Sequence, residues 1–177
     1  SNAVIKNCYI GGNININSGV GTQVLNSIIK SFVHVSNTAS AVLTNNVLAA
    51  NSYANAPTIY NTTYRNNIFL NMITVVGFSN CLLENNIANN AQFAATNGNQ
   101  INVDMATVFI NPTTGLDKDL QLKAGSPAIA AGVGGVNCGA FGGITPYKLS
   151  LIPPVPSIYK LVGPPAAVGG SMNVTIS

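Results

Sequence analysis

Charged side chains are scarce in this 177-residue sequence, which has no tryptophan and only one histidine. Charged residues make up 6% of the chain, whereas ordinary soluble domains contain about 25%. The seven basic and four acidic residues give a net charge of +3, and the basic residues form no cluster. Because a surface that follows a phosphate backbone needs such a cluster, we expect no nucleic-acid partner.

Long apolar runs and metal-ligand spacings are also missing. No uninterrupted apolar stretch reaches the roughly 18 residues that a membrane helix needs, so no transmembrane segment is predicted. The three cysteines lack the C-x-x-C spacing of zinc sites, and we expect buried free thiols. The sequence therefore predicts no metal ligands.

Asparagine supplies the strongest signal, because it marks a repeat of about 20 residues. Each repeat reads apolar, variable, Asn, small or polar, then apolar, and the spacings between successive asparagines are 19, 19, 21 and 19 residues. Such a period indicates a solenoid, in which no repeat can bury its apolar face alone. The repeated asparagines are Asn7, Asn26, Asn45, Asn66 and Asn85.

Short strand patterns between these asparagines predict a parallel β-helix. Alternating stretches occur at residues 13–17 and 32–36, and a β-branched run at 72–76, none long enough for a helix. Equivalent residues of stacked coils lie about 4.8 Å apart, so the repeated asparagines are predicted to form a structural ladder of side-chain hydrogen bonds. Asn also tolerates the left-handed backbone of a sharp corner. Which member of each Asn pair points inward stays open.

Two apolar columns should flank the corner. The column before the corner is Ile5, Val24, Leu43, Tyr64 and Leu83. The column after it is Tyr9, Ile28, Val47, Ile68 and Ile87.

The region after the repeats carries a family resemblance. Residues 120–142 contain Leu-x-Leu, then G-S-P-A-I, a glycine and G-A-F-G. This resembles the closing motif of right-handed parallel β-helix proteins of the pectate-lyase-like superfamily, commonly bacterial and secreted. Two positions depart from the family pattern: Ala130 stands where an acid is frequent, and Cys138 where an aliphatic residue is usual.

Three segments follow from these patterns. Residues 1–3 (Ser-Asn-Ala) have the sequence left by removal of an affinity tag and are set aside. Residues 4–145 are predicted to form an all-β, single-stranded, right-handed parallel β-helix of six to seven coils, closed by the G-S-P-A-I segment. Residues 146–177 hold six of the nine prolines and are predicted to form a Pro-rich strap ending in a strand.

The resemblance implies a polysaccharide as substrate or ligand, and a secreted or cell-surface location. Lyases of the superfamily use a basic residue and commonly calcium held by carboxylates, and hydrolases use paired carboxylates. The four acids are Glu84, Asp104, Asp117 and Asp119, and only Glu84 lies in a repeat. This number does not support a calcium site, so no cofactor and no catalytic residue are predicted.

Candidate ligand-binding residues lie on and beside the repeats. Arg65 and Glu84 occupy the same repeat position 19 residues apart, so they should form a cross-rung ion pair of under about 1 kcal/mol. Alternatively, with Lys6 two rungs further away in the same column, they form a polar patch for an acidic sugar.

Two tyrosines could offer rings for stacking on sugars. They are Tyr53, beside a two-residue insertion at residues 51–57, and Tyr64. The solitary His34 is expected to be structural.

Two functions from different classes fit these observations. The first is a non-catalytic secreted or cell-surface module that binds glycan or serves as a scaffold, which suits the scarcity of titratable groups. The second is a polysaccharide lyase or glycoside hydrolase, or the C-terminal part of one, acting on acidic polysaccharide. The second rests on the family resemblance alone, and a fold does not fix a function.

Overall fold

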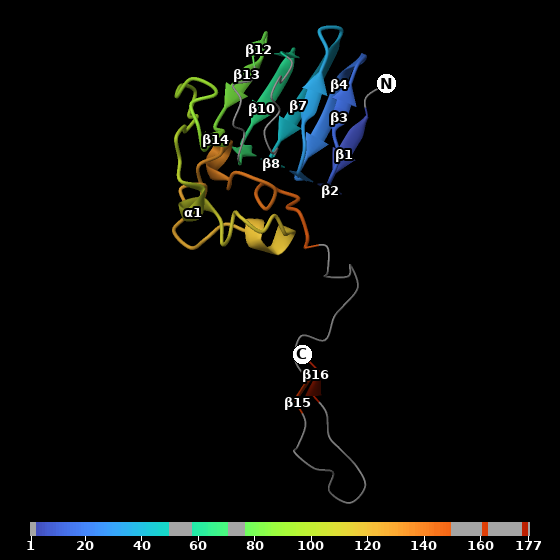
Figure 1. Cartoon of the computed structure of the whole chain (residues 1–177). Helices are drawn as coiled ribbons and strands as arrows, with labels where there is room; N and C mark the ends of the chain where they lie inside the picture. The colour runs from blue at the N-terminus through green and yellow to red at the C-terminus, as the bar shows by residue number, and fades with distance from the viewer. Residues whose placement is uncertain (1–2, 50–57, 71–76, 150–160, 163–174, 177) are drawn as a thin grey trace, which may run out of the picture.

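The computed structural model describes residues 3–49, 58–70, 77–149, 161–162 and 175–176. Parallel strands stack rung upon rung as a β-solenoid, and the described part contains almost no helix (Figure 1). The predicted all-β solenoid is therefore confirmed.

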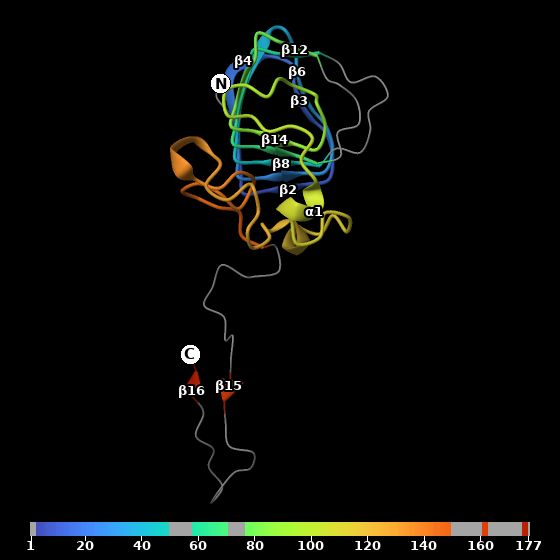
Figure 2. The ribbon, with the colours of Figure 1, turned by 90° about the vertical axis from the view of Figure 1, so that its left-hand side faces the viewer.

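Two five-stranded parallel sheets meet at the asparagine corner (Figure 2). Sheet A, before the corner, consists of β1 (Val4–Lys6), β4 (Gly19–Leu25), β7 (Ala39–Thr44), β10 (Thr62–Arg65) and β13 (Leu82–Glu84). Sheet B, after it, consists of β2 (Tyr9–Ile10), β5 (Ile28–Ile29), β8 (Val47–Leu48), β11 (Ile68–Phe69) and β14 (Ile87–Ala88). The remaining sides hold the pairs β3 (Ile14–Ile16) with β6 (Val33–Val35) and β9 (Ile59–Tyr60) with β12 (Phe78–Ser79).

The rung register follows the repeat. Ile5 pairs with Val24, Val24 with Leu43, and Tyr64 with both Leu43 and Leu83, as predicted. The second predicted column, from Tyr9 to Ile87, is also paired rung by rung. Sheet A has five rungs, so the expectation of six to seven coils is wrong. The chain stays in the stack through Asn99 and Gln100, and the later residues that were expected to form further coils leave it.

The first asparagine of each repeat makes the corner. Asn7, Asn26, Asn45, Asn66 and Asn85 all have φ between 45° and 57°, in the left-handed region that asparagine tolerates. The continuous side-chain ladder, however, lies one residue later. The first asparagines share a single side-chain bond, from Asn66 Nδ2 to Asn45 Oδ1 at 3.5 Å. The prediction that they form the continuous ladder is therefore wrong, because the left-handed corner directs their side chains away from the interior.

The ladder consists of Cys8, Ser27, Asn46, Asn67, Asn86 and Asn99. Each side chain from Ser27 onward accepts a hydrogen bond from the backbone N–H of the ladder residue in the preceding rung, at 2.9–3.2 Å. In addition, the Nδ2 of Asn67 donates to the carbonyl of Leu43 at 2.8 Å and to Asn86 Oδ1 at 3.1 Å. These bonds satisfy backbone groups that the corner would otherwise leave buried and unpaired.

The first asparagine column instead holds residues 131–142. Nδ2 of Asn85 donates to the carbonyl of Ala131, and Oδ1 of Asn66 accepts from the N–H of Val133. Asn45 donates to the carbonyls of Asn137 and Gly139, and Asn26 to those of Ala140 and Gly142. Residues 131–142 therefore run along the corner from the last rung back toward the first rungs.

From β5 to β14, sheet B is buried on both faces, whereas Tyr9 of β2 is 44% exposed. Its inward residues, including Leu48 and Phe69, belong to the core inside the solenoid. Its outward residues, including Val47 and Ile68, pack against Phe109, Leu120 and other residues of the closing segment. Buried parallel strands read as continuous apolar runs for this reason.

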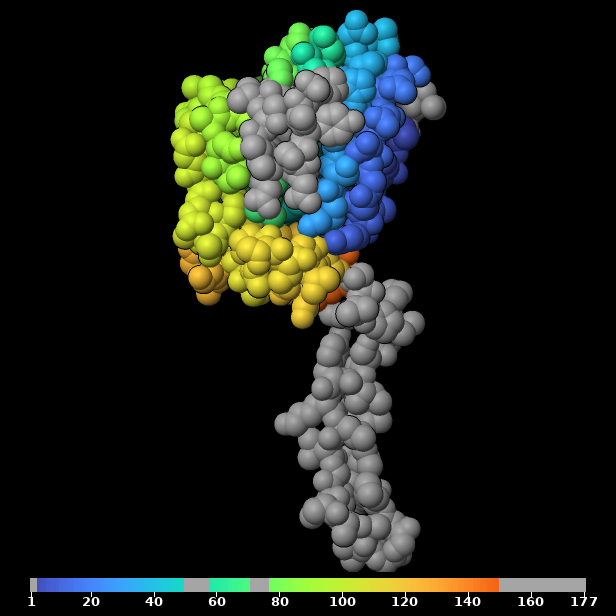
Figure 3. Space-filling view, in the orientation of Figure 1, coloured from blue at the N-terminus to red at the C-terminus, as the bar shows by residue number. Residues whose placement is uncertain are grey.

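The closing segment, residues 104–149, forms a layer beside the solenoid (Figure 3). The prediction that residues up to 145 belong to the coils is therefore wrong for this segment. It contains α1 (Met105–Val108), η1 (Asp117–Leu120) and η2 (Val133–Gly135). The motif that carries the family resemblance thus covers one outer face of the solenoid.

Most of the predicted Pro-rich strap lies outside the described residues. Within it, β15 (Leu161–Val162) pairs antiparallel with β16 (Thr175–Ile176). The expected strand at 72–76 and the insertion at 51–57 also lie outside the described residues.

Candidate functional site

The outer face of sheet A is left uncovered by the closing segment. Alternate residues of a strand point to opposite sides of its sheet, so two columns of side chains face outward, and none of them is buried. One column is Val4, Gln23, Val42, Thr63 and Leu82; the other is Lys6, Leu25, Thr44, Arg65 and Glu84.

A groove of about 440 Å³ lies along this face at the corner where the chain enters sheet A. Its lining comes from equivalent positions of three successive rungs, so the groove runs along the stacking direction. The lining residues are Ser40, Asn61, Thr62, Thr63, Asn80, Cys81 and Leu82.

A second pair of asparagines shapes the groove. Asn61 and Asn80 have φ values of 47° and 55°, and the Nδ2 of Asn80 donates to the Oδ1 of Asn61 at 2.8 Å. Asn61 in turn donates to the carbonyls of Asn37 and Ala39 at 3.1 and 3.2 Å. Left-handed asparagines therefore form the corner beside the groove, as they form the corner between sheets A and B.

Several polar groups of the groove are available to a ligand. Ser40 Oγ accepts from the N–H of Gly21 at 3.0 Å, which leaves its hydroxyl hydrogen free to donate. Within the described ranges, the Thr63 hydroxyl and the Asn80 Oδ1 have no hydrogen-bond partner. Leu82, 46% exposed, adds an apolar surface between them.

A smaller hollow of about 130 Å³ continues the groove toward the last rung. It shares Cys81 and Leu82 with the groove and reaches Phe93, whose ring packs on Phe69 and Phe78 inside the solenoid. The two hollows together extend from β7 to the segment that follows β14.

The predicted ion pair is confirmed. Arg65 and Glu84 are register partners on β10 and β13, and Arg65 Nε lies 2.8 Å from Glu84 Oε2. Their side chains are 42% and 31% exposed. Lys6 lies in the same column but three rungs from Arg65, with Leu25 and Thr44 between them, so the expected separation of two rungs is wrong.

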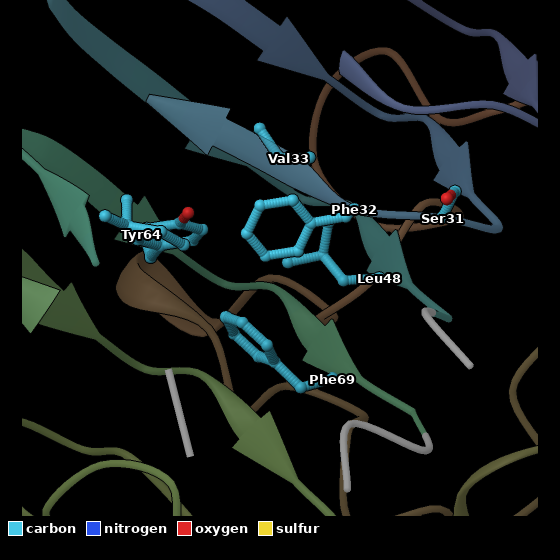
Figure 4. Close-up of a pocket in the computed structure, with 7 residues that line it drawn as sticks. Ser31, Phe32, Val33, Leu48, Tyr64 and Phe69 are labelled. Atoms are coloured by element: carbon cyan, nitrogen blue, oxygen red, sulfur yellow. The ribbon is translucent and has the colours of Figure 1, made fainter. Parts of the chain in front are cut away.

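Tyr64 is not a surface residue, so its predicted contact with a ligand is wrong. It is 1% exposed and packs against Phe69 and Phe78, because it belongs to the inward apolar column of sheet A. Burial raises the pKa of its hydroxyl. Figure 4 shows Tyr64, Phe32 and Phe69 pointing toward one another around a cavity of about 10 Å³, room for about one water molecule. Tyr53, the other predicted stacking residue, lies outside the described residues.

The four acidic residues all have structural partners. Glu84 pairs with Arg65, and Asp104 caps α1 by accepting from the N–H of Ala106 at 2.9 Å. The buried Asp117 accepts from the Tyr147 hydroxyl at 3.0 Å, and Asp119 accepts from the Thr114 hydroxyl at 2.7 Å. Over the described residues, no group of three or more His, Cys, Asp and Glu side chains could hold a metal ion.

The thiols are free, and only Cys138 is fully buried. Its Sγ donates to the carbonyl of Asn85 at 3.2 Å, and burial raises its pKa to about 12. Cys8 and Cys81 are half-buried, so the expectation of three buried thiols is wrong for these two. Burial also raises the pKa of Cys81, which keeps the thiol in the groove protonated.

The groove residues Ser40, Asn61, Asn80 and Leu82 were missed by sequence reasoning. A signal was present, because Asn61 and Asn80 are 19 residues apart, the same spacing as the main repeat.

Comparisons of the chain with protein-family models, curated proteins and solved structures gave no significant match. The class that the structure defines is a β-solenoid, and the likeness to the pectate-lyase-like superfamily stays a prediction. In the described part of the chain, no helix combines the length and the hydropathy needed to cross a bilayer.

Proposed function

We propose that this β-solenoid is a non-catalytic carbohydrate-binding module, and that a polysaccharide chain lies in the groove of sheet A. The observation that carries the proposal is the groove of about 440 Å³, which crosses three rungs and is lined by hydroxyl, amide and aliphatic side chains. A secreted or cell-surface location is part of this proposal, because that is where such ligands occur.

The chemistry of the lining suits sugar hydroxyls. A sugar hydroxyl donates one hydrogen bond and accepts others, so a site needs both kinds of group. Ser40 offers a donor, Asn80 Oδ1 an acceptor and Thr63 both. The exposed Leu82 can pack against the C–H face of a sugar ring, as binding sites combine apolar surface with a few placed polar groups.

The repeat of the solenoid suits a repeating ligand. Equivalent groups recur from rung to rung about 4.8 Å apart, and the smaller hollow lengthens the groove at its end. Ser40, Asn61 and Asn80 occupy equivalent positions of three rungs, so a polymer meets a hydroxyl or amide group there at each step, which adds binding free energy by multivalency. A lyase or hydrolase gains no comparable support, because each acid already has a structural partner.

The test is a binding screen of the intact chain against plant, host and bacterial polysaccharides, with and without calcium, followed by two matched variants. Thr63→Val removes a groove hydroxyl, and Thr44→Val removes an outward hydroxyl of β7 outside the groove lining. Loss of one hydrogen bond of about 1 kcal/mol lowers affinity about fivefold. We expect this for Thr63→Val and no change for Thr44→Val.

Two outcomes count against the proposal. If the chain binds no polysaccharide, the solenoid is a scaffold. If Thr63→Val and Thr44→Val bind equally well, the ligand lies on another face.

A further inference from the structure

The lining of the groove has no charged side chain. It consists of hydroxyl, amide, thiol and aliphatic groups, and burial keeps the one titratable group, Cys81, protonated. The nearest charges on the same face are Arg65, two residues after Thr63 on β10, and Glu84, two residues after Leu82 on β13. Since side chains two residues apart share a face, both charges border the groove.

These two charges cancel each other. Arg65 Nε and Glu84 Oε2 are 2.8 Å apart, so the pair is nearly neutral when viewed from a ligand further away. A carboxylate of an acidic sugar that approached Arg65 would also approach Glu84, which repels it. The pair therefore gives an acidic polymer no net attraction to the groove.

Lys6, the remaining charged residue of this face, is too far from the groove to attract an acidic polymer into it. Lys6 lies in the same column as Arg65, with Leu25 and Thr44 between them. Three rung steps of about 4.8 Å separate the two strands by roughly 14 Å, more than the Debye length of about 10 Å at 0.1 M salt. Screening thus removes most of the influence of Lys6 on the groove.

We propose that the groove selects neutral polysaccharides, and that Glu84 determines this selectivity by neutralising Arg65. The inference rests on the proposed carbohydrate-binding function and names the class of ligand. Glu84 does not need to touch the ligand. It holds the Arg65 guanidinium in an ion pair, so that acidic chains are not attracted.

The test compares a neutral β-glucan with polygalacturonate as probes, at about 0.1 M and about 0.5 M salt. Glu84→Gln keeps the shape of the side chain and removes its charge. We expect the unmodified protein to bind the glucan with an affinity that changes less than about twofold with salt. Glu84→Gln should gain about tenfold or more in affinity for polygalacturonate at low salt and lose this gain at high salt.

Two controls separate charge from structure. Lys6→Gln changes one charge of the same column far from the groove and should leave both affinities unchanged. Arg65→Gln combined with Glu84→Gln removes both charges and should restore the preference for the neutral glucan. A merely structural role of Glu84 would not produce a salt-dependent gain for one polymer.

The outcomes distinguish this inference from the proposed function. If the unmodified protein prefers polygalacturonate, and Thr63→Val weakens that binding, the carbohydrate function stands and the neutral selectivity is wrong. If it binds glucan but Glu84→Gln gains nothing for polygalacturonate, Glu84 does not set the selectivity. If neither polymer nor any other glycan binds, the proposed function fails, and this inference fails with it.

Discussion

Two adjacent columns of asparagine lie at the same corner, and their side chains point in opposite directions. Asn66 and its equivalents adopt left-handed backbone and direct their amides outward onto the closing segment. Asn67 and its equivalents direct their amides inward, where they bond to neighbouring rungs. The comparison shows that residue type alone does not decide the role of an asparagine in a solenoid, because the backbone conformation of one residue orients both side chains.

The two columns also differ in burial and in what they stabilise. Asn46, Asn67 and Asn86 are completely buried and satisfy backbone groups of the rungs themselves. Asn45 and Asn66 are 4% and 3% exposed, and apart from one 3.5 Å bond between them their side chains bond to residues 133–139. The inner column therefore stabilises the solenoid, and the outer column attaches the closing segment to it.

The largest effect is expected for Asn67→Ala in the inner column. The change removes the acceptor of the Asn46 N–H and the donor to the Leu43 carbonyl, both inside the solenoid. Two buried unpaired groups and a small cavity should lower the free energy of unfolding by about 3–5 kcal/mol. Urea unfolding measures this; a loss under about 1 kcal/mol would contradict the stabilising role of the ladder.

A smaller effect is expected for the outer column, where Asn45 provides two informative variants. Asn45→Gly keeps the left-handed backbone but loses the bonds to the carbonyls of Asn137 and Gly139, and should cost about 1 kcal/mol. Asn45→Ala adds about 1–2 kcal/mol of backbone strain. Limited proteolysis should show faster cleavage within residues 131–142 in both variants. Equal stability of the Gly and Ala variants would show that the corner conformation costs nothing.

Alkaline pH should weaken the contact between the closing segment and the outer column. Cys138, whose Sγ donates to the Asn85 carbonyl, has a pKa raised by burial from 9.0 to about 12. Above pH 9 the unfolded thiol releases its proton while the folded thiol keeps it, so the folded state binds more protons and stability falls as pH rises.

The expected slope is at most about 1.4 kcal/mol per pH unit. Urea unfolding at about pH 8 and about pH 10.5 measures the fall. Cys138→Ala serves as the control and should make the fall smaller in this window, although the raised pKa values of Cys81 and Tyr64 still contribute to it. A slope unchanged by that substitution would place its cause elsewhere, for example at the buried Tyr64 hydroxyl, whose pKa is also raised.

Ala130 tests whether asparagine is needed for left-handed backbone. Among the described residues, nine of the ten non-glycine residues with positive φ are asparagines, and Ala130, with φ of 55°, is the tenth. Ala130→Gly should raise the free energy of unfolding by about 0.5–1 kcal/mol by relieving strain. Ala106→Gly in α1 is the matched control and should have the opposite sign. Thermal unfolding measures both.

The smallest effect is expected on the outer face of sheet A. Arg65→Gln breaks a half-exposed ion pair and should change the free energy of unfolding by less than about 1 kcal/mol. Urea unfolding in low and high salt checks this. A larger, salt-sensitive loss would show that the ion pair stabilises the solenoid as the ladder does.

The repeat in the sequence predicted the stacking well. Its register placed Arg65 beside Glu84 and aligned both apolar columns correctly. The repeat did not show which asparagine points inward, because two adjacent asparagines have the same period. It also missed the last ladder residue, Asn99, which follows Asn86 by 13 residues and not by 19.

Other features depended on tertiary packing. Tyr64 occupies an apolar column, but periodicity alone does not show which face of the sheet points into the core of the solenoid. The closing motif has no period, so its packing on the outer face of sheet B could not be derived from spacing. The groove of sheet A depends on side chains from three rungs, and its residues Ser40 and Leu82 have no sequence pattern of their own.

The ladder has a consequence for how this chain can be altered. Its successive members are separated by 19, 19, 21, 19 and 13 residues, yet each makes the same hydrogen bond to the preceding rung. The corner therefore sets the register, while the number of residues around the rest of the coil is free to change. Because longer surface loops add little entropic cost, foreign peptides inserted opposite the corner should leave the stack in register. The solenoid is thus suited as a scaffold that presents grafted loops at the spacing of its rungs.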